Sequence, residues 1–172
     1  MSAPTLEIQP LDTQTHDRDS FTCGVAELDK YLKQDANRYA TQRISVTYVL
    51  TEVDLPAPRP IIGYYSLSAC VVQLDQAQKA LTASMAKKLP RFPEVPATLM
   101  GRLATASLYR GKGYGAMLLV NALKRGKQHA SVIGSYAMVV DAKDAAAEAF
   151  YVHYGFLKLA GQRLFLPFAS VP

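Results

Sequence analysis

The chain has 172 residues, of which 49% are hydrophobic, and a formal net charge of +5 at pH 7. This length predicts one domain with a single core, residues 1–172. No stretch approaches the roughly 20 apolar residues that cross a bilayer, so a membrane-spanning protein is not expected. Residues 1–5 lack the basic-then-apolar pattern of a secretory signal, which predicts a cytoplasmic protein. The positive charge favours anionic partners such as nucleic acid or CoA without selecting one.

The N-terminal half predicts three strands and one amphipathic helix. Residues 6–11 alternate as in a strand, and residues 44–52 and 61–69 predict an antiparallel hairpin around a proline-rich turn. The helix between them has a core-facing stripe at Val25, Leu28, Leu32, Ala36 and Tyr39. Its other face carries Lys30 and Lys33, with Arg38 at the margin. That face is either solvated or a basic surface for a substrate.

The middle of the chain is less regular. Residues 73–80 fit a helix or a loop, and residues 81–89 predict a short helix that ends near Lys87 and Lys88. The segment 90–96 contains Arg91 and three prolines, and it predicts a surface loop because proline breaks helices and sheet interiors. An extended run follows at residues 99–107.

A glycine-rich turn connects this run to an apolar helix that is predicted from Ala116. The turn contains Arg110, Gly111, Lys112, Gly113, Tyr114 and Gly115. Glycines allow a tight turn and a close approach of backbone N–H groups, and a helix N-terminus attracts anions. A Walker P-loop is excluded because no Lys-Ser or Lys-Thr pair closes the loop, and the dinucleotide fingerprint fits poorly. A phosphate cradle is predicted, although glycine-rich turns without a ligand also occur.

A second pattern follows the predicted strand 136–140. Residues 145–151 are rich in alanine and predict a helix, with Gly155 as its stop and Phe156 at the start of another strand. Asp144, Ala147 and Tyr151 are spaced along this segment.

Other residues with chemical potential are less informative. Cys23 and Cys70 lack metal-ligand spacing and are expected to be reduced thiols, so no metal is expected. The histidines at positions 16, 129 and 153 are expected to be solvated.

The two motifs together resemble the GNAT superfamily of acetyl-CoA-dependent N-acetyltransferases. Arg110-x-x-Gly113-x-Gly115 is similar to its pyrophosphate-binding motif. The family commonly carries Asn-x-x-Ala-x-x-x-Tyr and then Gly-Phe, and this chain departs from that pattern at Asp144, which stands where asparagine is usual. The resemblance implies an α/β fold whose mixed central sheet is flanked by helices and has a splayed parallel pair, here residues 101–107 and 136–140.

The resemblance also implies roles for individual residues. The main chain of Leu103, Ala104 and Thr105 would hold pantetheine and polarise the thioester carbonyl, and residues 110–115 would bind the pyrophosphate. Asp144 and Ala147 would lie beside acetyl-CoA. Tyr151 would protonate the departing CoA sulfur, since a phenol with a pKa near 10 is protonated at neutral pH.

A closer resemblance is to the toxins of GNAT type II toxin–antitoxin modules. It rests on residues 21–24, 28–32, 47–49, 89–93, 101–104, 149–151 and 155–156. Those toxins acetylate the α-amino group of aminoacyl-tRNA, pair with a ribbon-helix-helix antitoxin and are usually homodimers. The candidate tRNA contacts here are the basic residues Lys30, Lys33, Arg38, Lys87, Lys88 and Arg91.

Several alternatives stay open on sequence alone. Another GNAT activity, on a protein, a polyamine or another small-molecule amine, is the main one, although the scattered acidic residues disfavour a polyamine. A non-catalytic GNAT-like module and a nucleic-acid-binding protein without chemistry are weaker. Arg102 on the central strand either pairs structurally or contacts a substrate or cofactor.

Overall fold

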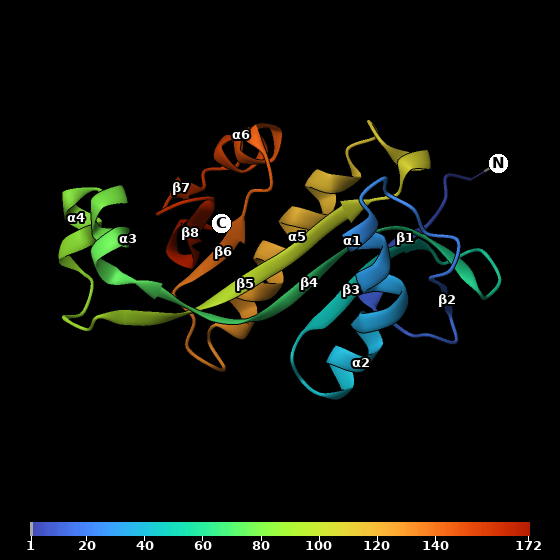
Figure 1. Ribbon diagram of the computed structural model, residues 1–172, viewed down its shortest axis with the longest axis horizontal. Helices are drawn as coiled ribbons and strands as arrows, with labels where there is room; N and C mark the ends of the chain where they lie inside the picture. The colour runs from blue at the N-terminus through green and yellow to red at the C-terminus, as the bar shows by residue number, and fades with distance from the viewer. Residues whose placement is uncertain (1) are drawn as a thin grey trace. The chain divides into compact units, whose positions relative to one another are not determined.

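The computed structural model describes residues 2–172 (Figure 1) and divides into two compact units. The first contains the chain up to Ser68 and Gly101–Ala122, and the second contains Ala69–Met100 and Leu123–Pro172. Strands β4 (Arg59–Gln73) and β5 (Glu94–Thr105) and helix α5 (Tyr114–His129) contribute residues to both. Among the described residues, no helix is long and apolar enough to cross a bilayer.

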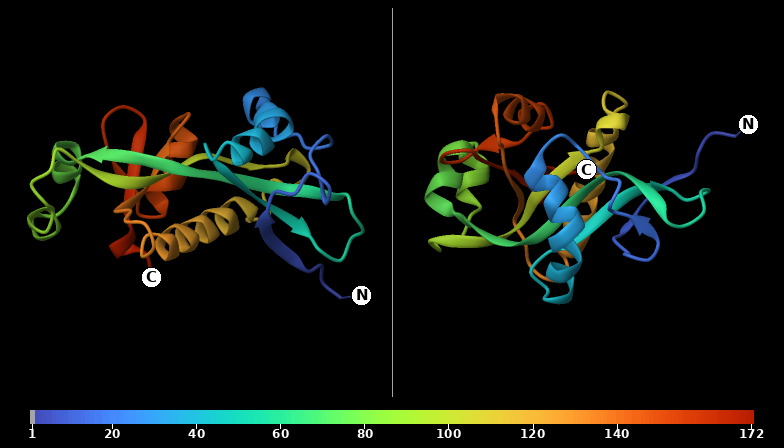
Figure 2. Two further views of the ribbon diagram at one scale, coloured as in Figure 1. Left: turned by 90° about the horizontal axis from the view of Figure 1, so that it is seen from below. Right: turned by 45° about the vertical axis from the view of Figure 1, so that its right-hand side comes forward.

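The first unit contains the N-terminal strands and a helical segment. Its other elements are β1 (Leu6–Pro10), β2 (His16–Asp17), α1 (Ala26–Lys30), the π-helix η1 (Tyr31–Asp35), α2 (Ala36–Thr41), β3 (Val46–Glu52) and the 3-10 turn η2 (Ser107–Tyr109). β1 and β4 both pair antiparallel with β3, and β2 pairs parallel with β4. In this unit α1–α2 lie on one face of β3 and β4 and the start of α5 lies on the other (Figure 2).

The second unit contains the remaining elements. They are α3 (Leu74–Ala80), α4 (Ala83–Lys87), β6 (Ala137–Asp141), α6 (Ala145–His153), β7 (Leu157–Lys158), β8 (Arg163–Pro167) and the 3-10 turn η3 (Phe168–Ser170). β5 and β6 form a parallel pair at Thr98↔Met138 and Leu99↔Val139. β8 pairs antiparallel with β6 and β7, so the sheet follows the order β1-β3-β4-β5-β6-β8-β7. The predicted mixed α/β fold with a parallel strand pair is confirmed.

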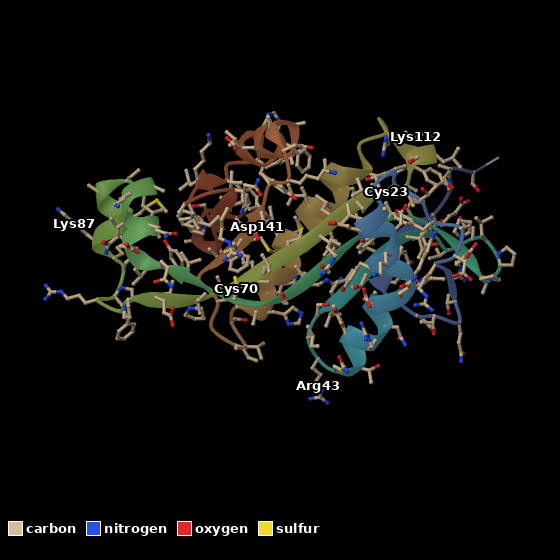
Figure 3. All side chains as sticks on the ribbon, viewed as in Figure 1. Cys23, Arg43, Cys70, Lys87, Lys112 and Asp141 are labelled. Carbon is tan, nitrogen blue, oxygen red and sulfur yellow. The ribbon has the colours of Figure 1, made fainter. Side chains whose placement is uncertain are left out.

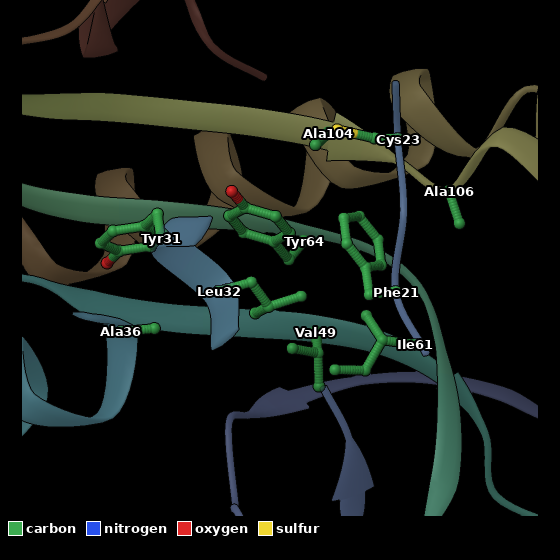
Figure 4. Packing of buried hydrophobic residues seen from close by; sticks show 10 residues of the cluster. All are labelled: Phe21, Cys23, Tyr31, Leu32, Ala36, Val49, Ile61, Tyr64, Ala104 and Ala106. Carbon is green, nitrogen blue, oxygen red and sulfur yellow. The ribbon is translucent and has the colours of Figure 1, made fainter. Parts of the chain in front are cut away.

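Each unit has its own apolar core. In the first, the stripe predicted for the helix packs on β3, β4 and β5, with Leu32 and Ala36 fully buried (Figure 4). In the second, Val139 and Phe165 pack with residues of α3. Residues 137–140 are buried on both faces of β6, which is typical of a central strand covered by helices.

Most predicted elements are confirmed, but several boundaries were wrong. The proline-rich loop is shorter than predicted, because β5 begins at Glu94 and includes Pro96, whose carbonyl accepts from Tyr136 N–H at 2.8 Å. β5 also ends at Thr105, two residues before the predicted end. The sequence pattern did not predict the π-turn η1, the strand β2 or the separation of β7 from β8.

Candidate active site

The glycine-rich segment follows β5 and leads into α5. After Thr105 the chain forms η2, then residues 110–113, then the helix from Tyr114. Gly111 and Gly113 have φ angles of +76° and +81°, a left-handed conformation that strains residues with a Cβ. The helix begins two residues earlier than predicted, so Tyr114 and Gly115 belong to its first turn.

The surroundings of this turn fit a phosphate group. A Cβ built on Gly111 or Gly113 meets no atom within 4 Å, so the turn is open. Met117 N–H donates to the Gly113 carbonyl at 3.2 Å, while the earlier N–H groups of a helix have no intrahelical acceptor. Those donors and the helix dipole attract an anion, and the exposed Lys112 adds a cation (Figure 3). This arrangement can hold a phosphate group.

Arg110 fastens the turn to the segment around Cys23. Its guanidinium donates a hydrogen bond from Nη2 to the Cys23 carbonyl oxygen. A Cβ added at Gly24 would lie 2.9 Å from the same nitrogen, so this glycine leaves room for the guanidinium. Because a guanidinium carries five N–H donors, the bond leaves others available for a phosphate. Sequence reasoning missed this link, since its partners are 87 positions apart.

The three residues predicted to hold pantetheine form the end of β5. Ala104 is buried in the first unit's core, whereas the Thr105 hydroxyl lies 3.8 Å from a Cβ built on Gly115 of α5. Neighbouring side chains of a strand point to opposite faces, so Leu103 shares the face of Thr105. Ala106 N–H donates to the Ile62 carbonyl at 2.8 Å, which keeps the strand end attached to β4.

Tyr151 lies on α6 in the second unit and is only 7% exposed. Its ring contacts Phe150 and Phe156, with centroids 5.3 and 5.4 Å apart. Burial raises the pKa of Tyr151 to about 12, so the phenol is protonated at neutral pH. Among the described residues the Tyr151 hydroxyl makes no hydrogen bond. Every fully buried side-chain oxygen of these residues does make one. The Tyr151 oxygen is therefore not fully buried, although the side chain as a whole is.

The spacing from Tyr151 to Gly-Phe is explained by the end of α6. Gly155 has φ +93° and its N–H donates to the Val152 carbonyl at 3.0 Å. Phe156 N–H donates to the Tyr151 carbonyl at 3.1 Å, and the two rings are in contact. These bonds and the apolar contact define a Schellman motif. The motif therefore fixes the backbone and the ring of Tyr151 together.

Asp144, the departure from the family pattern, caps the other end of α6. Its carboxylate accepts from Ala147 N–H at 2.8 Å. Aspartate and asparagine are about equally good N-caps, so the substitution keeps the helix start that the motif requires. The Ala147 N–H is occupied by this bond. Whether either residue also contacts acetyl-CoA stays a prediction.

The six basic residues predicted to contact tRNA fall into two groups. Lys30, Lys33 and Arg38 lie on α1–α2 in the first unit, where Arg38 pairs with Asp35 at 2.6 Å. In the second unit Lys87 ends α4 (Figure 3), and Lys88 and Arg91 follow it. The second group is exposed, and none of its members has an ion-pair partner among the residues described.

His16, which we expected to be solvated, is buried. Its Nδ1 accepts from Asp12 N–H at 3.0 Å, so the ring proton lies on Nε2, which donates to Gln9 Oε1 at 3.2 Å. Burial lowers the pKa of His16, which keeps the ring neutral. His129 and His153 are exposed, as expected. Burial also raises the pKa of the Cys70 thiol, which disfavours a nucleophilic thiolate.

Comparisons with known proteins agree with this geometry. The probable toxin TacT of Sinorhizobium fredii is 30% identical over 95% of this chain and 92% of its own length. The tRNA-acetylating toxin of Mycobacterium tuberculosis is 32% identical over 80% of this chain and 76% of its own length. Both alignments cover most of the two proteins compared.

Two solved structures of AtaT show the same fold. AtaT complexed with acetyl-methionyl-tRNAfMet has a TM-score of 0.85 and 28% identity, with 97% of each chain covered. A tyrosine-to-phenylalanine mutant of AtaT, bound to the C-terminus of the antitoxin AtaR and acetyl-CoA, has a TM-score of 0.79 and 25% identity. It covers 96% of this chain and 95% of that one.

A family model provides the assignment. The model described as the acetyltransferase (GNAT) family matches residues 52–156, which include the glycine-rich turn and the helix of Tyr151. This match, the full-length relative and the fold agree that the chain belongs to the GNAT family of acetyltransferases.

Proposed function

We propose that this acetyltransferase is the toxin of a type II toxin–antitoxin module. In this proposal it transfers the acetyl group of acetyl-CoA to the α-amino group of aminoacyl-tRNA, which blocks translation. The observation that carries the proposal is the likeness to AtaT over 97% of both chains, because that protein was solved with acetyl-methionyl-tRNAfMet. The tRNA-acetylating toxin of Mycobacterium tuberculosis supports the same substrate class.

The proposed chemistry is direct transfer. The neutral amine attacks the thioester carbonyl carbon, the bond from that carbon to sulfur breaks, and the amine nitrogen loses its proton to solvent water, from which Tyr151 regains the proton that it gives to the sulfur. The sulfur leaves as a thiolate and takes a proton from the Tyr151 hydroxyl, which its raised pKa keeps available. The N–H groups at residues 111–115 hold the pyrophosphate, and the main chain of Leu103–Thr105 aligns the thioester. No protein base is required if the amine is already neutral.

The proposal includes partners and a setting. The toxin is neutralised by an antitoxin, as the AtaT complex with the AtaR C-terminus supports, and the proposed antitoxin carries a ribbon-helix-helix part. It acts in the cytoplasm as a homodimer, and residues 1–172 work as one domain. Strands β4 and β5 and helix α5, which contribute to both compact units, support that last point. Lys30, Lys33, Arg38, Lys87, Lys88 and Arg91 contact tRNA phosphates.

The experiment is acetyl transfer from labelled acetyl-CoA to bulk charged tRNA. Deacylated tRNA, a polyamine and a lysine peptide are run in parallel. We expect label on charged tRNA alone, released by mild base together with the amino acid. Gly113→Asp places a carboxylate in the phosphate cradle and is expected to abolish transfer while the circular dichroism spectrum stays unchanged.

The parallel acceptors make the result decisive. Label on the peptide or the polyamine, with none on charged tRNA, would agree with the family assignment and with acetyl-CoA as co-substrate, but it would refute the proposed toxin activity. Normal transfer by Gly113→Asp would overturn the phosphate cradle instead.

A further inference from the structure

Arg102 is the one basic residue of β5, whose sequence is otherwise mostly apolar. The residue is half-buried, and its guanidinium carbon lies 3.6 Å from the centroid of the Tyr31 ring. Among the described residues it donates no side-chain hydrogen bond and belongs to no ion pair. Partly buried cations usually have an anionic partner, because desolvation is costly. The cation–π contact with the Tyr31 ring offsets only part of that cost.

Tyr31 is itself held by several contacts. Its hydroxyl shares hydrogen bonds with the buried hydroxyls of Ser45 and Thr47, at 2.7 and 2.9 Å. Its ring stacks on Tyr64, with centroids 6.0 Å apart, and the Tyr64 hydroxyl donates to the Leu28 carbonyl at 2.7 Å (Figure 4). The aromatic face under Arg102 is therefore fixed, and the planar guanidinium is fixed with it.

The backbone that presents Tyr31 is unusual. The residue opens the π-helix η1 between α1 and α2. Single π-turns inside α-helices are rare and frequently occur at functional sites. The ring of Tyr31 is thus positioned by the π-turn, by two buried hydroxyls and by stacking on Tyr64, and the Arg102 guanidinium lies against that ring. Its planar set of five donors matches a phosphate or carboxylate group.

The position of Arg102 distinguishes its ligand from the pyrophosphate. Arg102 and Ala104 share one face of β5, and Ala104 packs in the same core as Tyr31. Thr105 points to the opposite face, toward Gly115 at the start of α5. The Arg102 side chain therefore lies on the opposite face of β5 from Thr105 and the start of α5. Lys112 and the first turn of α5 already offer donors to the pyrophosphate, which leaves an anion of the other substrate, the acceptor, as the ligand of Arg102.

We propose that Arg102, positioned by Tyr31, binds a phosphate group of the acceptor substrate near the 3′ end of the tRNA. This inference rests on the proposed function. It assigns the unpartnered guanidinium to a backbone phosphate, which bidentate hydrogen bonds recognise without reading sequence. The exposed Lys30, which precedes Tyr31, adds positive charge.

The test compares Arg102→Gln, Arg102→Lys and the charge-matched control Arg43→Gln. Arg43 is exposed in the turn between α2 and β3 (Figure 3). We expect Arg102→Gln to raise KM for charged tRNA about 10- to 100-fold, because hydrogen bonds to charged groups are strong. The kcat and the acetyl-CoA Kd should stay within about twofold. Arg102→Lys should recover part of the KM, since it keeps the charge and loses the planar geometry.

A salt titration separates binding from packing. When one single-stranded phosphate is no longer neutralised, the slope of log K against log salt falls by about 0.7, whereas a merely structural defect leaves it unchanged. An unchanged KM and slope in Arg102→Gln, or an equal change in Arg43→Gln, would overturn the inference. A weaker acetyl-CoA Kd with normal charged-tRNA KM would also overturn it, because the anion would then belong to CoA. Wild-type protein inactive on charged tRNA would instead refute the proposed function.

Discussion

At the scale of single residues, Tyr151 combines a buried ring with an oxygen that is not fully buried. Its neighbours Phe150 and Phe156 exclude water from the ring, and this burial raises the pKa to about 12. The neutral phenol predominates below the pKa, so the proton is present throughout the range in which amines become nucleophilic. A proton donor for a thiolate needs this combination of availability and access.

Tyr151→Phe removes the hydroxyl and keeps the packed ring. We expect kcat to fall about 100-fold or more, the usual range for loss of a general acid, with the acetyl-CoA Kd unchanged within about twofold. Single-turnover kinetics and calorimetry measure the two quantities. With a pKa raised to about 12, the wild-type rate should not lose its acid as the pH rises to about 10. Unchanged turnover in the variant would remove Tyr151 from the mechanism.

Single residues also show the limit of sequence reasoning. Tyr151 and the glycine turn could be selected as candidates because the local spacing of residues carries their motifs. The bond from Arg110 to the Cys23 carbonyl and the stacking of Arg102 on Tyr31 join residues 87 and 71 positions apart. A periodic pattern in the sequence cannot predict such contacts, because these groups come together only in the folded chain.

At the scale of elements, the end of α6 shows why a short motif has fixed spacing. The Schellman bonds need a residue with positive φ four positions after Tyr151, and an apolar residue next to it. Gly155 and Phe156 supply both. The Gly-Phe pair is therefore a structural support for the candidate acid, and it needs no contact with a ligand.

Gly155→Ala should weaken this support. A Cβ there makes only an ordinary contact, 3.8 Å from Leu166 Cδ1, so the cost is conformational, about 1–2 kcal/mol. The matched control is Gly161→Ala, at φ +66° with no atom within 4 Å of its Cβ. Urea denaturation should show similar destabilisation of both variants, and only Gly155→Ala should also lower kcat. Equal kcat in the two variants would refute the positioning role of this cap.

Helices and strands were predicted best where one face is apolar, and worst where the backbone departs from the regular pattern. The stripe from Val25 to Tyr39 correctly predicted a core-facing helix, because side-chain periodicity follows from helix geometry. The same pattern could not show that η1 widens into a π-turn. Pro96 argued against a strand, yet β5 includes it and uses its carbonyl.

At the scale of the whole molecule, the net charge is +5, and the basic residues differ in whether they form ion pairs within the protein. Arg163 pairs with Asp141 at 3.0 Å, and Lys158 pairs with Glu148. Lys87, Lys88 and Arg91 are exposed and, within the described part of the chain, have no such partner. Exposed cations without a partner contribute most to attraction of a polyanion.

The triple variant Lys87→Gln, Lys88→Gln, Arg91→Gln tests this distribution. We expect weaker binding of charged tRNA at every sequence and a salt slope that falls by about 0.9 for each duplex phosphate that the variant no longer neutralises. Filter binding across a salt series measures it. The acetyl-CoA Kd serves as the internal control and should not change. A slope equal to that of wild type would exclude these three residues from the tRNA surface.

The sequence by itself determined the order of most elements, the family resemblance and the candidate groups, because glycine turns, helix caps and apolar stripes are local properties. Tertiary structure alone decided that His16 is buried and that Arg102 lies on Tyr31 with no anionic partner among the described residues. Each of these depends on which distant atoms surround the side chain. The burial of His16 lowers its pKa, and the surroundings of Arg102 leave its side-chain N–H donors without an acceptor among the described residues. Only the folded chain creates these surroundings.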